Sequence, residues 1–237
     1  MILRKALMAS HAEAERTRTP DFPARELAVL QGFQRDRLAA TYADLAAQPR
    51  YADACRFFLD ELYGGRNAEE RDRQVEAALP IIQRTLPRRM QVALADAFRL
   101  QAISMAGDIA LAEAMAETGI AALNPAAYAA LYPRVPREAR EEQIALIHQL
   151  AMELDRVVHL PLVLGLLIAM RGPARSAGFH ALQQFLERGL RAFRTMRGAE
   201  TFAATIRERE QAIMERLYAG DPDPFRPGSR SVPADSG

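Results

Sequence analysis

The chain is poor in cysteine, because Cys55 is the only one among its 237 residues. An internal disulfide and a zinc site built from several cysteines are therefore excluded. Cys55 lies on the apolar side of a segment with helical periodicity, so we expect a small buried hydrophobic residue there. A reactive thiol would need exposure and a neighbouring cation, and the sequence indicates neither.

The sequence also lacks a hydrophobic run long enough to span a membrane. Its most apolar stretch, residues 160–170, has eleven residues and includes Pro161 and Gly165. A span needs about 18 or more apolar residues. Residues 1–16 contain no apolar core of the length found in signal peptides. We therefore expect a cytoplasmic protein that makes no contact with membranes.

Lysine is also rare, and the net charge is small. Lys5 is the only lysine, and the other 30 basic residues are arginines. The formal net charge is +1, with 49% hydrophobic and 26% charged residues, which is ordinary for a soluble globular protein. Such a balance does not favour the strongly basic surface that nucleic acids bind.

Signatures of catalysis are missing too. The chain has no Gly-rich phosphate loop and no Gly-x-Ser-x-Gly elbow. None of its four histidines has a glutamate three residues before it, which excludes the pattern of di-iron bundles. These absences favour a protein that is not an enzyme. We predict no cofactor, and the alternative prediction is a bound divalent metal.

Strand-like alternation is absent, whereas helical periodicity recurs along almost the whole chain. The pattern predicts an all-α fold, a single compact bundle of about seven to nine helices over residues 1–220. A disordered tail is expected over residues 221–237, which are rich in Pro, Ser, Gly and Asp. The expected helices cover residues 2–15, 23–48, 51–63, 68–85, 87–117, 126–131, 137–170, 179–197 and 200–218. Pro80 and Pro161 should each bend the helix that contains them.

The most informative segment is the aromatic end of the helix expected over residues 51–63. Tyr51, Cys55 and Phe58 recur at helical spacing, so one face should bury a large aromatic surface. Gly64 and Gly65 then suit a helix end, and Asn67 with Glu70 has the spacing of a capping box for the next helix.

The run from Phe57 to Gly64 resembles the signature Phe-Phe-Leu-x-Glu-Leu-Tyr-Gly of a family of uncharacterised proteobacterial, all-helical proteins. In that family a charged segment, a Leu-Pro helix start and an Ala-rich helix follow, and residues 67–72, 86–87 and 93–104 keep this order. Residues 178–189 and 207–210 are similar too, so the resemblance spans roughly residues 25–225. It implies a bacterial protein, but no activity, cofactor or catalytic residue.

A polar stripe on the helix expected over residues 137–170 is the first candidate site. His148, Asp155 and His159 are separated by seven and four residues and therefore share one side of a helix. They are candidate metal ligands or an acid–base pair, with Glu141 as an additional ligand. The alternative is ordinary polarity at the boundary of an amphipathic helix.

Two further candidates involve arginine. Arg209 lies near the centre of the last helix's apolar stripe and predicts a structural ion pair, with Asp96 as one candidate partner. Arg188, Arg191, Arg194 and Arg197 recur every third residue and form a slanting basic ridge. The ridge is a candidate interaction surface for nucleic acid or an acidic protein, and the alternative is a solvated helix face.

We therefore expect a non-catalytic, cytoplasmic protein-interaction or regulatory module that contacts a protein partner or a second copy of itself. The first alternative is a helical-bundle enzyme that binds a metal or cofactor at His148, Asp155 and His159. The second alternative is a nucleic-acid-associated protein that uses the ridge from Arg188 to Arg197.

Overall fold

The structure is a computed structural model that describes residues 2–63, 68–85, 88–160 and 163–226. Within these residues it contains helices, turns and bends but no strand, which confirms the all-α prediction. Twelve α-helices are present in this part of the chain, and eight of them have 15 residues or more. The long helices are α1 (Ile2–Arg16), α2 (Ala24–Thr41), α4 (Pro49–Tyr63), α5 (Ala68–Thr85), α6 (Arg88–Thr118), α8 (Arg137–Val158), α11 (His180–Met196) and α12 (Glu200–Tyr218). The short ones are α3 (Ala43–Ala46), α7 (Pro125–Leu131), α9 (Val163–Ala169) and α10 (Arg171–Ser176), with a 3₁₀ turn at Tyr132–Arg134.

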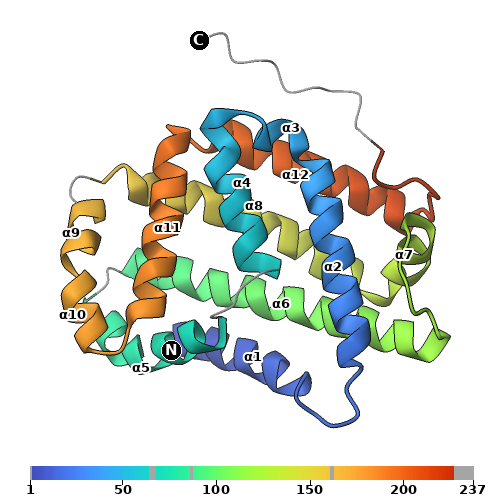
Figure 1. Cartoon of the computed structure of the whole chain (residues 1–237), viewed down its shortest axis with the longest axis horizontal. Helices are drawn as coiled ribbons and strands as arrows, with labels where there is room; N and C mark the ends of the chain where they lie inside the picture. Colours follow the sequence, from blue (N-terminus) through green and yellow to red (C-terminus); the bar gives the residue numbers. More distant parts are fainter. Residues whose placement is uncertain (1, 64–67, 86–87, 161–162, 227–237) are drawn as a thin grey trace.

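The two longest helices, α6 and α8, run through the middle of the molecule (Figure 1). Helix α1 lies along α6, and α12 packs on α8. Helices α2 and α11 run across α6 and α8 in this view, and α4 runs across α8. The pair α9 and α10 packs beside α11 at one edge, at the end of the molecule away from α7.

Three hydrophobic clusters form the core, and each joins helices that are distant in sequence. One lies between α2, α6, α7, α8 and α12, and includes Leu30 and Met115. The second joins α3, α4, α8, α11 and α12 around Phe193 and Phe202. The third joins α1, α5 and α6 around Leu7 and Phe98. Because burial of apolar surface dominates folding, these faces determine how the helices pack.

Helix α4 buries the aromatic face that its spacing predicts. Tyr51 and Cys55 are buried, and the Phe58 ring packs 5.8 Å from Phe193 and 6.0 Å from Phe202, measured between ring centroids. Burial, with a smaller contribution from the negative charge of Asp44, raises the pKa of the Cys55 thiol to about 11. The interpretation of Cys55 as a buried hydrophobic residue is confirmed, because Cys55 is a buried free cysteine.

The helix expected over residues 137–170 is two helices, because α8 ends at Val158 and α9 begins at Val163. Pro161, where we expected a bend, lies outside the described residues. Gly64, Gly65, Asn67 and the Leu86-Pro87 start also lie outside them, and the side chain of Glu70 is not described. The predictions on these residues stay predictions. Pro80 lies inside α5, as expected.

The structure corrects the boundary of the tail predicted from residue 221. Residues 221–226 pack against the bundle: Pro224 is fully buried, and the Phe225 ring lies 6.0 Å from that of Phe33. Arg216 Nε donates to the Pro224 carbonyl oxygen at 2.7 Å. The polar composition of residues 221–226 obscured Pro224 and Phe225, the two apolar residues that attach this segment to the bundle. Residues 227–237 lie outside the described residues.

Close packing of α4 on α11 makes Gly189 sensitive to substitution. A Cβ atom added to Gly189 would lie 3.0 Å from Phe57 Cζ, and a larger side chain would push the two helices apart. We expect Gly189→Val to lower the free energy of unfolding by about 1–3 kcal/mol. Urea denaturation followed by circular dichroism measures this change.

The matched control is Gly32→Ala in the interior of α2. A Cβ atom there meets no atom within 4 Å, so this variant should gain about 0.5–1 kcal/mol from the better helix propensity of alanine. Equal stability of Gly189→Val and the original chain would show that α4 and α11 do not pack as closely as described.

Candidate interaction surface

The polar stripe predicted as a metal site lies along one side of α8, where Asp155 is also half-buried, and ends at the C-terminus of the helix. His148 is half-buried, and His159 is the exposed C-cap residue of the helix. The His159 Nδ1 atom lies 2.6 Å from the Asp155 carbonyl oxygen and 3.7 Å from Asp155 Oδ1. Among the described residues, no group of three or more His, Cys, Asp or Glu side chains could hold a metal ion. Function at these residues stays a prediction.

Arg209 forms an ion pair, but its partner is Asp44 rather than Asp96. The guanidinium donates to both Asp44 carboxylate oxygens, at 2.7 and 2.6 Å, and to the Thr41 carbonyl oxygen at 2.8 Å. The Asp96 carboxylate instead accepts from Gln149 Nε2 at 3.0 Å. Asp44 lies on the four-residue helix α3, which folds against the start of α4, and this turn brings it to α12.

The third candidate, the arginine ridge, is exposed along its whole length. Helix α11 buries Ala181, Phe193 and Met196 on its core side, whereas Arg188, Arg191 and Arg194 lie on its exposed side. Arg197 follows the helix with a positive φ of 53°, and Gly198 continues the turn. The ridge therefore faces solvent, as its spacing predicts for an amphipathic helix.

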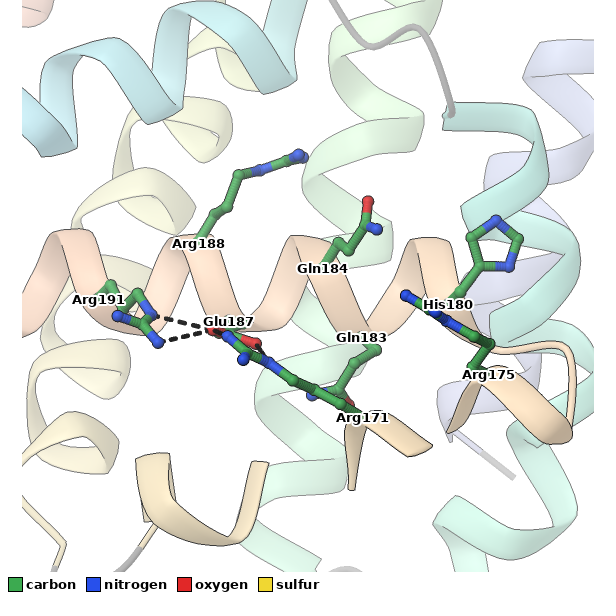
Figure 2. Close-up of a pocket in the computed structure, with 8 residues that line it drawn as sticks. All are labelled: Arg171, Arg175, His180, Gln183, Gln184, Glu187, Arg188 and Arg191. Atoms are coloured by element: carbon green, nitrogen blue, oxygen red, sulfur yellow. Dashed lines mark hydrogen bonds and ion pairs between the residues drawn. The ribbon is translucent and has the colours of Figure 1, made fainter. Parts of the chain in front are cut away.

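Helix α10 adds two arginines that sequence analysis missed. Arg171 and Arg175 line a pocket of about 420 Å³ together with α11 residues (Figure 2). The α11 side of the pocket is formed by His180, Gln183, Gln184, Glu187, Arg188 and Arg191. We call the six arginines at positions 171, 175, 188, 191, 194 and 197 the arginine surface.

Glu187 lies at the centre of this pocket and joins its two helices. The buried carboxylate accepts from Arg171 Nε at 2.8 Å, and from Arg191 Nε at 3.0 Å and Nη2 at 2.8 Å. Arg171 Nη2 also donates to it. These bonds, from Arg171 above all, hold the pKa of Glu187 below its usual range. Glu187 therefore stays ionised and fixes α10 on α11 (Figure 2).

Charge is unevenly distributed along the chain. Residues 157–199 contain the six arginines of the arginine surface and one acid, Glu187, which gives this segment a formal charge of +5. The whole chain carries +1, so the remaining residues carry −4. Within the described residues, Arg175, Arg194 and Arg197 form no ion pair. The nearly neutral total thus conceals one strongly basic region.

The chemistry of the pocket suits binding more than catalysis. Its eight lining residues include no Ser, Thr or Cys that could act as a nucleophile. Glu187 is held ionised by two arginines and therefore cannot serve as a general acid near pH 7. Guanidinium groups bind carboxylates and phosphates in two-point contacts, so the arrangement fits an anionic partner.

In the described parts of the chain, no helix has both the length and the apolar character to cross a bilayer. Comparison with curated proteins finds no match, and neither does comparison with solved structures. A family described as a domain of unknown function, DUF8198, matches residues 13–224. The matched range ends at the buried Pro224, in agreement with a domain that extends past residue 220. The chain belongs to the DUF8198 family, whose function is unknown, as the resemblance implied.

Proposed function

We propose that this chain is a cytoplasmic, non-catalytic interaction module whose arginine surface binds an acidic segment of another protein. The observation that carries the proposal is the charge of +5 over residues 157–199 in a chain whose total is only +1. Such segregation attracts partners of opposite charge and raises the rate of association. The exposed positions of the six arginines support it, because exposed charges are available to a partner.

An acidic protein explains the surface better than a nucleic acid does. No Phe, Tyr or Trp lines the pocket, and aromatic stacking is the usual means by which proteins bind single strands. Glu187 already pairs with Arg171 and Arg191, which leaves Arg175 and Arg194 as separate sites for the anions of a partner. Carboxylates spaced along a protein segment can contact Arg175 and Arg194 while avoiding Glu187.

Charge reversal tests the proposal. We expect a fluorescein-labelled poly-L-glutamate of about 20 residues to bind the chain at low salt and to weaken as salt rises. The variant Arg175→Glu/Arg194→Glu should weaken binding by at least about tenfold, because two attractive charges become repulsive. Fluorescence anisotropy measures both effects.

The control is Arg35→Glu/Arg207→Glu, which makes the same change at exposed arginines of α2 and α12 outside the arginine surface. Its affinity should stay within about twofold of the original chain. Absence of binding at low salt, or an equal loss in both variants, would refute the proposal. Tighter binding of a single-stranded DNA oligonucleotide than of poly-glutamate would favour the nucleic-acid alternative instead.

A further inference from the structure

Exposed apolar side chains gather in the same segment as the arginine surface. The described residues include seven large hydrophobic side chains that are exposed, and four of them lie within residues 157–199. These four are Leu160 (52% exposed), Ile168 (37%), Met170 (45%) and Leu186 (39%), and we call them the apolar rim. Exposed apolar groups next to charged ones mark surfaces that bind other molecules.

Hydrogen bonds join the segment that contains Ile168 and Met170 to α11. Ile168 lies at the end of α9, and Met170 directly precedes Arg171, which is bonded to Glu187 of α11. Gln183 Nε2 also donates to the Leu167 carbonyl oxygen and attaches α9 to α11. Helices α9, α10 and α11 lie together at one edge of the molecule (Figure 1), so the segment that contains Ile168 and Met170 meets the helices of the arginine surface there.

The charges decide which partner fits this edge. A second copy packed through a two-fold contact would place the arginine surface against itself, so like charges would face each other. A flat bilayer surface would meet the rim but could not enter the pocket, whose buried residues are Gln183 and Glu187. A helix that carries carboxylates beside apolar side chains matches both the rim and the pocket.

We infer that the arginine surface and the apolar rim together bind an amphipathic helix that presents acidic and apolar side chains to them. The inference rests on the proposed function and specifies the class of its partner. Apolar side chains of the helix pack on Ile168 and Met170, and its carboxylates contact the arginines of α10 and α11. Such binding combines an apolar anchor with charge complementarity.

Two peptides of identical Leu and Glu composition, each about 18 residues long, separate this inference from the proposed function. In one peptide the leucines follow helical spacing and form a single face, and in the other they are dispersed around the helix. We expect the amphipathic peptide to bind the full chain at least about tenfold more tightly, measured by fluorescence anisotropy.

The variant Ile168→Ser/Met170→Ser should remove most of this tenfold preference, because it deletes the apolar contacts and leaves every charge in place. Met8→Ser is the control, since Met8 is equally apolar, 62% exposed and located on α1. Met8→Ser should leave the tenfold preference for the amphipathic peptide unchanged. Circular dichroism confirms that both variants fold.

Equal affinity for the two peptides, unaffected by Ile168→Ser/Met170→Ser, would overturn the inference and leave the proposed function intact. Failure of both peptides to bind at low salt would overturn the proposed function itself. Binding to phosphatidylglycerol vesicles that depends on Ile168 and Met170, without peptide binding, would assign the rim to a lipid surface and overturn the inference.

Discussion

Replacing Arg140 with methionine is expected to destabilise the folded chain by about 3 kcal/mol. Arg140 of α8 and Asp108 of α6 are both buried, and Gln34 Nε2 donates to Asp108 Oδ1 at 3.1 Å. Burial raises the pKa of Asp108, whereas the Arg140 guanidinium acts in the opposite direction. Without Arg140 the Asp108 carboxylate loses its nearby cation, and the cation–π contact with Tyr132 is lost too. Urea denaturation at pH 7 measures the loss.

A second substitution and a surface control make this expectation specific. Asp108→Asn added to Arg140→Met should recover part of the stability, because it removes the uncompensated charge. Arg134→Met breaks an exposed ion pair with Glu117 (2.8 Å) and should cost no more than about 1 kcal/mol. If Arg140→Met is no more damaging than Arg134→Met, the buried charges contribute little to the fold.

The same pair predicts a pH dependence. Because burial raises the folded-state pKa of Asp108 above its unfolded value, the folded chain binds this proton more tightly. The stability that Asp108 contributes is therefore fully present below its unfolded pKa of about 3.9 and is lost as pH rises through the folded pKa. Removing Arg140 raises that folded pKa further. The destabilisation by Arg140→Met should thus decrease as pH is lowered from 7 toward the unfolded pKa of Asp108, in paired denaturation curves.

Glu210→Ala should cost about 3 kcal/mol, in contrast to a much smaller effect of Glu215→Ala on the same helix. Glu210 Oε1 accepts from Arg37 Nη1 at 2.6 Å and from the Tyr42 hydroxyl at 2.7 Å. The Arg37 and Glu210 side chains are only 12% and 17% exposed. Removing the Glu210 carboxylate therefore leaves the largely buried Arg37 guanidinium and Tyr42 hydroxyl without this acceptor. Chemical denaturation of both variants measures the difference.

Glu215 is the matched control because it also binds an arginine through short bonds. Its carboxylate accepts from Arg137 at 2.7 and 2.9 Å, but the two side chains are 59% and 40% exposed. Solvent screens such a pair, so its loss should lower the free energy of unfolding far less than the loss of Glu210 does. Glu210→Gln retains an oxygen that accepts from Tyr42 and should fall between the two alanine variants. Similar costs for the two alanine variants would contradict the role assigned to burial.

The helices were largely predictable because helical periodicity is a local property. The apolar spacing of Tyr51, Cys55 and Phe58 predicts the buried face of α4, and the three-residue step from Arg188 to Arg197 predicts an exposed ridge. Predictions were less accurate where a few contacts override composition. Pro224 and Phe225 attach a segment that looks like a polar tail, and α8 stops at Val158 before the expected end.

The candidate surface was only partly predictable. The ridge on α11 could be read from sequence spacing, and a local charge count would have revealed the basic segment around it. The pocket could not be predicted, because it depends on α10 folding back so that Arg171 reaches Glu187, 16 residues later. The apolar rim was also missed, since residues 160–170 have the composition of a core helix.

The order of residues in this chain sets which segments are helical, which faces are apolar and where arginines recur, since each depends on neighbours within a few positions. Packing decided the partners: Arg209 meets Asp44, 165 residues away, and Arg140 is buried near Asp108. An arginine can pair with any acidic side chain that folding brings within reach. The burial of the surrounding apolar faces therefore determines which acid it meets.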